Sequence, residues 1–490
     1  MLNLKKEDIC FMSACEMAEK IRTQELTSVE ITEIIIERIE KINPIINAYC
    51  TPTFDIAREM AKKADAAVKK GDKLGLLHGI PISIKDETET KDIKTTFGCV
   101  AYENFIPEED DIIVKRVKDA GAVILGKTNT PAFGYKGVTD NLLFGPTKNP
   151  WNLEKTSGGS SGGAAAAVAA GISPLAIGSD GGGSIRIPSC FCGVYGLKPH
   201  FGRIPHNDML LAGYLGTFIH RGPIVRYVKD AALMLDVLTG PDDIDRYSLP
   251  KPNYSYFEKL EEKPKKLRIG FSFDLGFIKT IDEEVRQSVL NAIKKFEKFD
   301  WVVEKSNQLN LKSSNETILG KITIQMPELA MFVIWTSGFA YSTKKLFKKW
   351  KDKLDPELVQ NINLGFSFST EDIKSAEIHR ELIYSNICKH FKEYDILITP
   401  TLACPAFRLG ISDAEEINGK PVGPGAWMHY TYPFNMSGHP AASIPCGWSS
   451  EGLPIGMQII GNRFDDLKVL QVSKAFEEIQ PWQEKKPQFN

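Results

Sequence analysis

The sequence predicts an α/β fold in which a large mixed β-sheet is covered by helices on both faces. Six short apolar runs have the length and composition of strands, and amphipathic helical stretches separate most of them. Alternation of this kind is typical of helices packed on the two sides of a sheet. The six runs are residues 79–84, 122–125, 174–177, 267–271, 396–398 and 455–460.

The chain of 490 residues is predicted to form a single catalytic domain, residues 1–490. Residues 1–70 are expected to be helical, because Thr27 and Glu30 have capping-box spacing. Four isoleucines then share one helical face, and Asn43-Pro44 is expected to end that helix. The four are Ile31, Ile35, Ile39 and Ile42.

Three further segments are assigned from composition and motifs. Residues 71–240 are predicted to be the catalytic core, since they hold the unusual lysine and Gly-Ser motifs described below. Residues 242–266 are rich in Pro, Asp, Lys and Glu, and we expect a surface crossing between two halves of the sheet. Residues 304–363 are charged and helical in pattern, so we predict a helical insertion that shapes substrate access.

Composition excludes several classes of protein. Lys and Arg total 60 against 62 for Asp and Glu, so no overall field attracts nucleic acid or an anionic membrane. No apolar stretch approaches the ~20 residues of a membrane span, and the polar start of the chain lacks a signal peptide. The nine cysteines form no disulfide or metal-ligand pattern, so we expect a cytoplasmic protein without a metal or cofactor.

Two glycine-flanked serines, Ser160 and Ser184, stand out. The alanine-rich helix and short strand expected between them would return both serine loops to one end of the sheet. Gly181, Gly182 and Gly183 suit an oxyanion hole, because successive unencumbered N–H groups can converge on a developing negative charge. A flexible linker is disfavoured, since ordered apolar segments flank both runs; phosphate binding is disfavoured, since neither nucleotide-binding glycine motif is present.

A serine nucleophile needs a base, and none of the eight histidines lies in a nucleophile-elbow context. Lys85 ends the apolar run at 79–84, an unusual place for a hydrated ammonium. Burial there would lower its pKa, so that the neutral amine could accept a proton. A lysine that reaches out to solvent is the competing interpretation of this segment alone.

Together these motifs resemble the amidase signature family. Gly-Gly-Ser-Ser-Gly-Gly at 158–163, Gly-Ser-Asp-Gly-Gly-Gly-Ser-Ile-Arg at 178–186 and Gly-Ile-Pro-Ile-Ser-Ile-Lys-Asp at 79–86 are similar to its signature and lysine motifs. The similarity continues through Gly-Lys-Thr-Asn at 126–129, Asn-Pro-Trp-Asn at 149–152 and Pro-Ile-Gly-Met-Gln at 454–458, over nearly the whole chain.

The resemblance implies a Ser-cisSer-Lys triad of Ser184, Ser160 and Lys85, with a cis peptide bond before Ser160. Lys85 would take a proton through Ser160 from Ser184, which would attack the amide carbonyl and form an acyl-enzyme. The resemblance also implies supporting roles for three neighbours and contact with substrate for four further residues. The supporting residues are Ser161, Asp180 and Arg186; the substrate-binding candidates are Thr128, Asn129, Trp335 and Trp427.

The family contains free-standing amidases, such as 6-aminohexanoate hydrolases, and the glutaminase A subunit of glutamyl-tRNA amidotransferase. We expect a free-standing hydrolase of a small linear amide, because residues 216–223 lack the Ser-Leu-Asp-Gln type of segment usual in the amidotransferase. The Arg- and Tyr-rich glutamine-pocket segment is also not recognisable in residues 344–377. The amidotransferase glutaminase remains the alternative, and a homodimer is left open.

Overall fold

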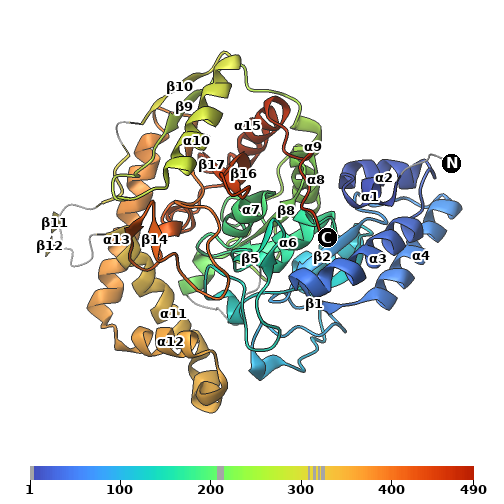
Figure 1. Ribbon diagram of the computed structural model, residues 1–490, viewed down its shortest axis with the longest axis horizontal. Coiled ribbons are helices and arrows are strands. Elements are labelled where there is room, and N and C mark those ends of the chain that lie inside the picture. The colour runs from blue at the N-terminus through green and yellow to red at the C-terminus, as the bar shows by residue number, and fades with distance from the viewer. Residues whose placement is uncertain are drawn as a thin grey trace.

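The computed structural model describes residues 5–206, 214–306, 309–312, 316–317, 320–321 and 326–489. An 11-stranded mixed sheet crosses the molecule in the order β1-β3-β2-β6-β8-β7-β16-β17-β13-β9-β10, which confirms the predicted α/β class (Figure 1). Its strands are β1 (Tyr49–Pro52), β2 (Pro81–Lys85), β3 (Val123–Thr128), β6 (Leu175–Asp180), β7 (Tyr195–Lys198), β8 (His220–Val225), β9 (Arg268–Phe271), β10 (Val302–Lys305), β13 (Ile396–Pro400), β16 (Ala441–Trp448) and β17 (Pro454–Gly461).

All six predicted strands are present, as β2, β3, β6, β9, β13 and β17. The sequence patterns missed β1, β7, β8, β10 and β16. Four of these five contain glycine or proline, residues that ordinarily weaken a strand assignment. In β8, Gly222 and Pro223 lie in the middle of a strand that is buried throughout. Packing on both faces therefore stabilises strands whose own sequence gives little signal.

The N-terminal helices are α1 (Lys6–Cys10), α2 (Ala14–Arg22), α3 (Ser28–Ile46) and α4 (Phe54–Lys70). The capping box of Thr27 and Glu30 is present at the start of α3, as predicted. The predicted end of this helix was wrong, because α3 continues through Pro44 to Ile46. Proline removes only one N–H donor, and the helix ends where Asn47 adopts a left-handed conformation at φ 53°.

Within the described residues, eleven more α-helices pack on or beside the sheet: α5 (Ile112–Asp119), α6 (Gly162–Ala169), α7 (Arg186–Cys192), α8 (Val228–Leu238), α9 (Tyr256–Lys259), α10 (Glu283–Lys295), α11 (Pro327–Trp350), α12 (Pro356–Ser367), α13 (Thr370–His390), α14 (Pro433–Met436) and α15 (Asp466–Ile479). A Cβ added at Gly456 of β17 would meet Cys190 of α7, whereas one at Gly461 would meet Val469 of α15. Since side chains alternate along a strand, α7 and α15 cover opposite faces.

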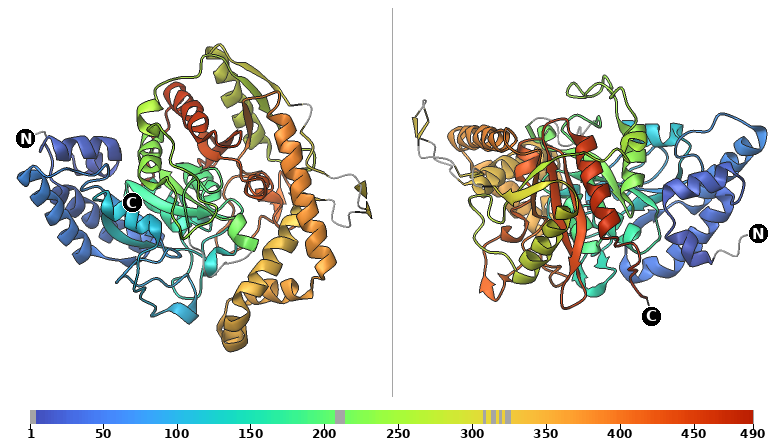
Figure 2. Two further views of the ribbon diagram at one scale, coloured as in Figure 1. Left: turned by 180° about the vertical axis from the view of Figure 1, so that it is seen from behind. Right: turned by 90° about the horizontal axis from the view of Figure 1, so that it is seen from above.

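The predicted insertion at 304–363 is only partly helical. Helices α11 and α12 lie with α13 at the end of the molecule opposite the N-terminal helices (Figures 1 and 2). Before them, the two-residue strands β11 (Glu316–Thr317) and β12 (Gly320–Lys321) form a separate antiparallel ladder. The rest of this segment at 307–308, 313–315, 318–319 and 322–325 lies outside the described residues. Two other small ladders join β4 (Lys148–Asn149) to β5 (Asn152–Thr156) and β14 (Glu416–Ile417) to β15 (Lys420–Pro421).

Helices α11 and α12 share a small apolar core with the loops at 97–105 and 132–135. Phe339 of α11 and Ile362 of α12 are buried in one cluster with Phe97 and Phe133. The helical pair is therefore anchored to the loops that follow β2 and β3. Among the described residues, no helix is both long and apolar enough to cross a membrane.

Candidate active site

Strands β2 and β6 are parallel neighbours, so their carboxyl ends reach the same edge of the sheet. Lys85 ends β2 and is completely buried. Its Nζ lies 2.6 Å from Ser160 Oγ and 2.8 Å from Ser179 Oγ, the latter on β6. The order β3-β2-β6 thus brings the sequence-predicted lysine and one of the two predicted serines into contact.

The environment of Lys85 disfavours its charge. Burial lowers the pKa of Lys85 to about 8, although Glu87, with Oε2 3.2 Å from Nζ, raises it in part. The Glu87 contact alone would indicate an ion pair with a charged lysine. Burial is the larger effect, so a substantial fraction of the amine is neutral close to neutral pH.

Ser160 lies just before α6, and the peptide bond between Gly159 and Ser160 is cis, as the resemblance implied. A Cβ at Gly159 would lie 2.5 Å from the carbonyl carbon of Val138, so only glycine fits here. The next residue, Ser161, joins the two serine loops: its N–H donates to the carbonyl oxygen of Ser184 at 3.1 Å. Its Oγ donates to the carbonyl oxygen of Ser179 at 3.2 Å.

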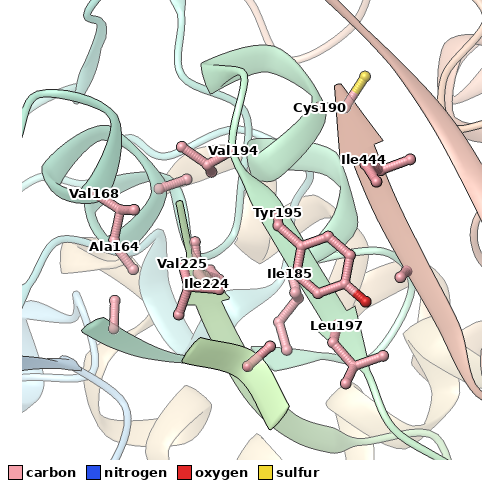
Figure 3. Packing of buried hydrophobic residues seen from close by; sticks show 14 of the residues in the cluster. Ala164, Val168, Ile185, Cys190, Val194, Tyr195, Leu197, Ile224, Val225 and Ile444 are labelled. Atoms are coloured by element: carbon pink, nitrogen blue, oxygen red, sulfur yellow. The ribbon is translucent and has the colours of Figure 1, made fainter. Parts of the chain in front are cut away.

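Ser184 lies in the loop between β6 and α7 and is 8% exposed. Its neighbour Ile185 packs into the sheet among Leu197 and Ile224, below Ala164 and Val168 of α6 (Figure 3). Glycines on three adjacent strands make room for this side chain, since a Cβ on any of them would lie 2.9–3.1 Å from Ile185. These glycines are Gly178, Gly196 and Gly222. Ile185 therefore anchors the position of Ser184.

A buried charge network supports the same loop. Arg186 donates to both carboxylate oxygens of Asp180, at 2.8 and 2.9 Å, and both side chains are fully buried. Arg186 also donates to Thr431 O, Gln458 Oε1 and Asn435 Oδ1, so its guanidinium connects α7 to β17 and α14. Burial alone would raise the pKa of Asp180, but Arg186 and Asn435 hold it well below its ordinary value.

The glycine loop presents backbone donors beside Ser184. The N–H of Gly183 donates to Asp180 Oδ1 at 2.8 Å and is therefore occupied. The N–H groups of Gly181, Gly182 and Ser184 have no acceptor within the described part of the chain. Trp335 and Met331 of α11 approach this loop, because a Cβ at Gly181 would lie 2.8 Å from Trp335 and one at Gly182 would lie 3.2 Å from Met331.

The other substrate-binding candidates occupy different surroundings. Asn129 is buried, with its Nδ2 donating to Gly145 O and Thr147 Oγ1 and its Oδ1 accepting from Asn141. Trp427 is fully buried; its ring stacks on Phe191 at 5.6 Å and its Nε1 donates to Asp413. Both have the contacts of structural residues. Thr128 lies opposite Lys85 in the β2–β3 register, and its buried Oγ1 has no partner among the described residues.

Sequence reasoning missed several residues of the site. Glu87 lies two positions after Lys85, close enough in sequence to have been considered, but its partner Arg221 lies 134 residues away. Ser179 precedes Asp180 and gave no signal of its own, because nothing local indicates that it faces Lys85. Asn435 and Gln458 are equally remote from the motifs and reach the site only through the packing of α14 and β17.

Known proteins resemble the chain over nearly its full length. A family model described as Amidase matches residues 30–470. An acylamidase of Rhodococcus erythropolis is 37% identical, covering 99% of this chain and 98% of its own. The glutaminase component of a glutamyl-tRNA(Gln) amidotransferase from Sulfurihydrogenibium sp. (strain YO3AOP1) is 35% identical, covering 96% of this chain and 98% of its own.

Solved structures extend the comparison to the fold. A bacterial aryl acylamidase of the amidase signature family has a TM-score of 0.87 at 31% identity, covering 97% of both chains. A 6-aminohexanoate cyclic dimer hydrolase complexed with substrate has a TM-score of 0.86 at 27% identity, covering 98% of this chain and 99% of that one. The chain therefore belongs to the amidase signature family and is a hydrolase that acts on amides.

Proposed function

We propose that the chain is a free-standing amidase that hydrolyses a small linear amide through an acyl-enzyme on Ser184, with Ser160 and Lys85 as a proton relay. The observation that carries this proposal is the 2.6 Å separation between Lys85 Nζ and Ser160 Oγ at a fully buried lysine. A neutral amine at hydrogen-bond distance from a hydroxyl can take its proton.

In the first half-reaction, Lys85 takes the proton of Ser160 while Ser160 takes that of Ser184. The Ser184 oxygen then forms a bond to the amide carbonyl carbon, and the carbonyl oxygen becomes negative. The N–H groups of Gly181, Gly182 and Ser184 are the proposed donors to this oxygen, since Asp180 already binds the N–H of Gly183. As the C–N bond breaks, the proton returns through Ser160 to the departing amine.

In the second half-reaction, water gives a proton to the relay and attacks the acyl carbon. The bond to Ser184 breaks, Ser184 regains its proton, and the carboxylic acid is released. Asp180, Arg186 and Ser161 support the geometry without exchanging protons in this scheme. Their contacts hold the glycine loop and join the two serine segments.

The substrate is proposed to carry an apolar group next to the reacting carbonyl. Trp335 and Met331 approach the glycine loop from α11, so the segment at 304–363 contributes to substrate access in this proposal. The 37% identity to an acylamidase and the likeness to an aryl acylamidase support a free-standing enzyme. The 35% identity to an amidotransferase component favours the second candidate, a glutaminase that works within a complex.

A serine-directed fluorophosphonate tests the nucleophile. We expect one adduct per chain, located on Ser184 by peptide mass spectrometry, and neither adduct nor amide hydrolysis in Ser184→Ala. Ser189→Ala is the matched control, because Ser189 Oγ is buried on α7 without a hydrogen-bond partner among the described residues. Full activity in Ser184→Ala would disprove the assignment.

The purified chain alone distinguishes the two candidate functions. A free-standing amidase should release amine from simple aliphatic or aryl amides without tRNA, ATP or a partner protein. Hydrolysis confined to glutamine, and dependent on an added partner, would establish the glutaminase instead.

A further inference from the structure

We propose that Glu87 and Arg221 form a positioning pair that orients the Lys85 amine toward Ser160 and balances the charge around it. This inference rests on the proposed function of Lys85 as the base. Neither residue belongs to the three motif residues of the proposed relay, and neither needs to contact the substrate. Their effect on the reaction would pass through Lys85.

The oxygens around Lys85 define the orientation. Within the described part of the chain, Nζ has three oxygen neighbours: Ser160 Oγ at 2.6 Å, Ser179 Oγ at 2.8 Å and Glu87 Oε2 at 3.2 Å. A neutral amine has two N–H donors and one lone pair. Ser179 Oγ lies within range of one N–H, and the Glu87 carboxylate can only accept, so it takes the other. The lone pair is then directed at the hydroxyl of Ser160, the group from which Lys85 must take a proton.

The position of Gly134 shows how closely Glu87 approaches Ser160. A Cβ at this residue would lie 2.8 Å from Glu87 Oε2 and 3.1 Å from Ser160 Oγ. Both oxygens therefore lie against the same stretch of backbone, with no side chain between them. Glu87 is thus part of the immediate surroundings of the relay and 11% exposed in its side chain.

Arg221 supplies the balancing charge. Its Nη1 donates to Glu87 Oε1 at 2.7 Å, and its side chain is 2% exposed. It lies on β8 opposite Ser179 of β6 in the strand register, so the sheet fixes its distance from Lys85. Because a guanidinium stays protonated, it stabilises the Glu87 anion without help from Lys85. Without Arg221, the buried carboxylate would favour the ammonium form of Lys85, which cannot act as base.

The remaining charge near Lys85 is Asp180, at the end of β6. It also raises the pKa of Lys85, but Arg186 and Asn435 bind its carboxylate. The order of effects on Lys85 is burial first, then Glu87, then Arg221 in the opposite direction to Glu87. Glu87 and Arg221 are therefore the opposing charges whose removal separately should move the titration in opposite directions.

The test is the pH dependence of kcat/KM for amide hydrolysis in single and double variants. Glu87→Gln removes the anion, so the acidic limb should move to lower pH by roughly one unit. Arg221→Gln leaves Glu87 unbalanced, so the limb should move to higher pH by a similar amount and activity at pH 7 should fall about tenfold. The double variant should return close to the wild-type limb.

Two further variants separate charge from orientation. Glu87→Ala should lower the alkaline plateau as well as move the limb, because it removes the acceptor that orients the amine, whereas Glu87→Gln should keep most of the plateau. Arg221→Lys keeps the cation and should keep the limb, which provides a readout if Arg221→Gln folds poorly. Asp110→Asn, which removes the carboxylate bound to Lys118 at 2.8 Å, is the control for loss of an ion pair elsewhere.

An acidic limb that stays fixed in both Glu87→Gln and Arg221→Gln would overturn the inference. The proposed function fails separately, if Lys85→Ala keeps wild-type amide turnover. Inactive Lys85→Ala together with unmoved limbs would leave the relay in place and remove the role of Glu87 and Arg221.

Discussion

Asp180 Oδ1 accepts the N–H of Gly183 at 2.8 Å, so a carboxylate at the end of β6 fixes the residue immediately before Ser184. The same carboxylate is held from the other side by Arg186. One buried ion pair therefore determines where the nucleophile loop lies, and the backbone donors next to it are left to face the reacting carbonyl.

Arg186→Met should destabilise the protein severely. It leaves Asp180 buried without its cation, and loss of one partner of a buried pair costs about 3–5 kcal/mol. Urea unfolding should report the loss as a lower free energy of unfolding. Arg268→Met, which breaks an exposed pair with Glu304, is the control and should change stability by less than about 1 kcal/mol. Equal effects of the two substitutions would contradict the supporting role of Asp180 and Arg186.

Amide hydrolysis should rise with pH through about 8 and remain high at alkaline pH. Burial lowers the pKa of Lys85 to about 8, and the deprotonated amine is the active form of a base. The rise should therefore follow loss of the Lys85 proton, measured as kcat/KM between pH 6 and 10. A profile that falls over this range would mean that the essential group acts in its protonated form.

Lys85→Ala should reduce amide turnover by at least the ~10²- to 10⁴-fold attributed to positioned acid–base catalysis. Activated esters should lose less, because their leaving group needs less protonation. The comparison of the two substrate types in one variant is the measurement. Equal losses on esters and amides would indicate a structural rather than a proton-transfer role.

Gly159→Ala should greatly reduce activity by displacing Ser160. The added methyl group would lie 2.5 Å from backbone of Val138, which cannot give way as a flexible side chain can. Overpacking of this kind costs about 1–3 kcal/mol and shifts neighbouring backbone. Gly423→Ala is the matched control, because a Cβ there meets nothing within 4 Å. Turnover and thermal unfolding of both variants should be compared, and a fully active Gly159→Ala would show that the close contact tolerates a methyl group.

Trp335→Ala should change substrate preference. Its ring lies against Gly181, so truncation should open space beside the proposed oxyanion donors. Small acyl amides should lose up to about 10- to 200-fold in kcat/KM, while bulkier ones lose less. Trp350→Ala, at the far end of the same helix α11, is the control. An unchanged ratio of kcat/KM between small and bulky amides would place the substrate elsewhere.

The sequence by itself determined the parts of this protein that depend on local pattern. Apolar runs specified six strands, because continuous burial leaves a readable signal along the chain. Glycine-rich spacing and the family resemblance identified Lys85, Ser160 and Ser184 as candidates, and two of these lie in contact in the structure. The helix end at Pro44 was misjudged, because one missing donor does not outweigh the packing of the last turn.

Only the tertiary structure decided what surrounds these residues. Glu87 and Arg221 meet because β8 pairs with β6, beside β2, and no local signal in His220–Val225 specifies that order. Asn129 and Trp427 resembled substrate contacts in sequence, but their polar groups bind structural partners from distant loops. Strand order and long-range pairing depend on how whole faces of the sheet are buried, a property of the assembled core that no short segment carries.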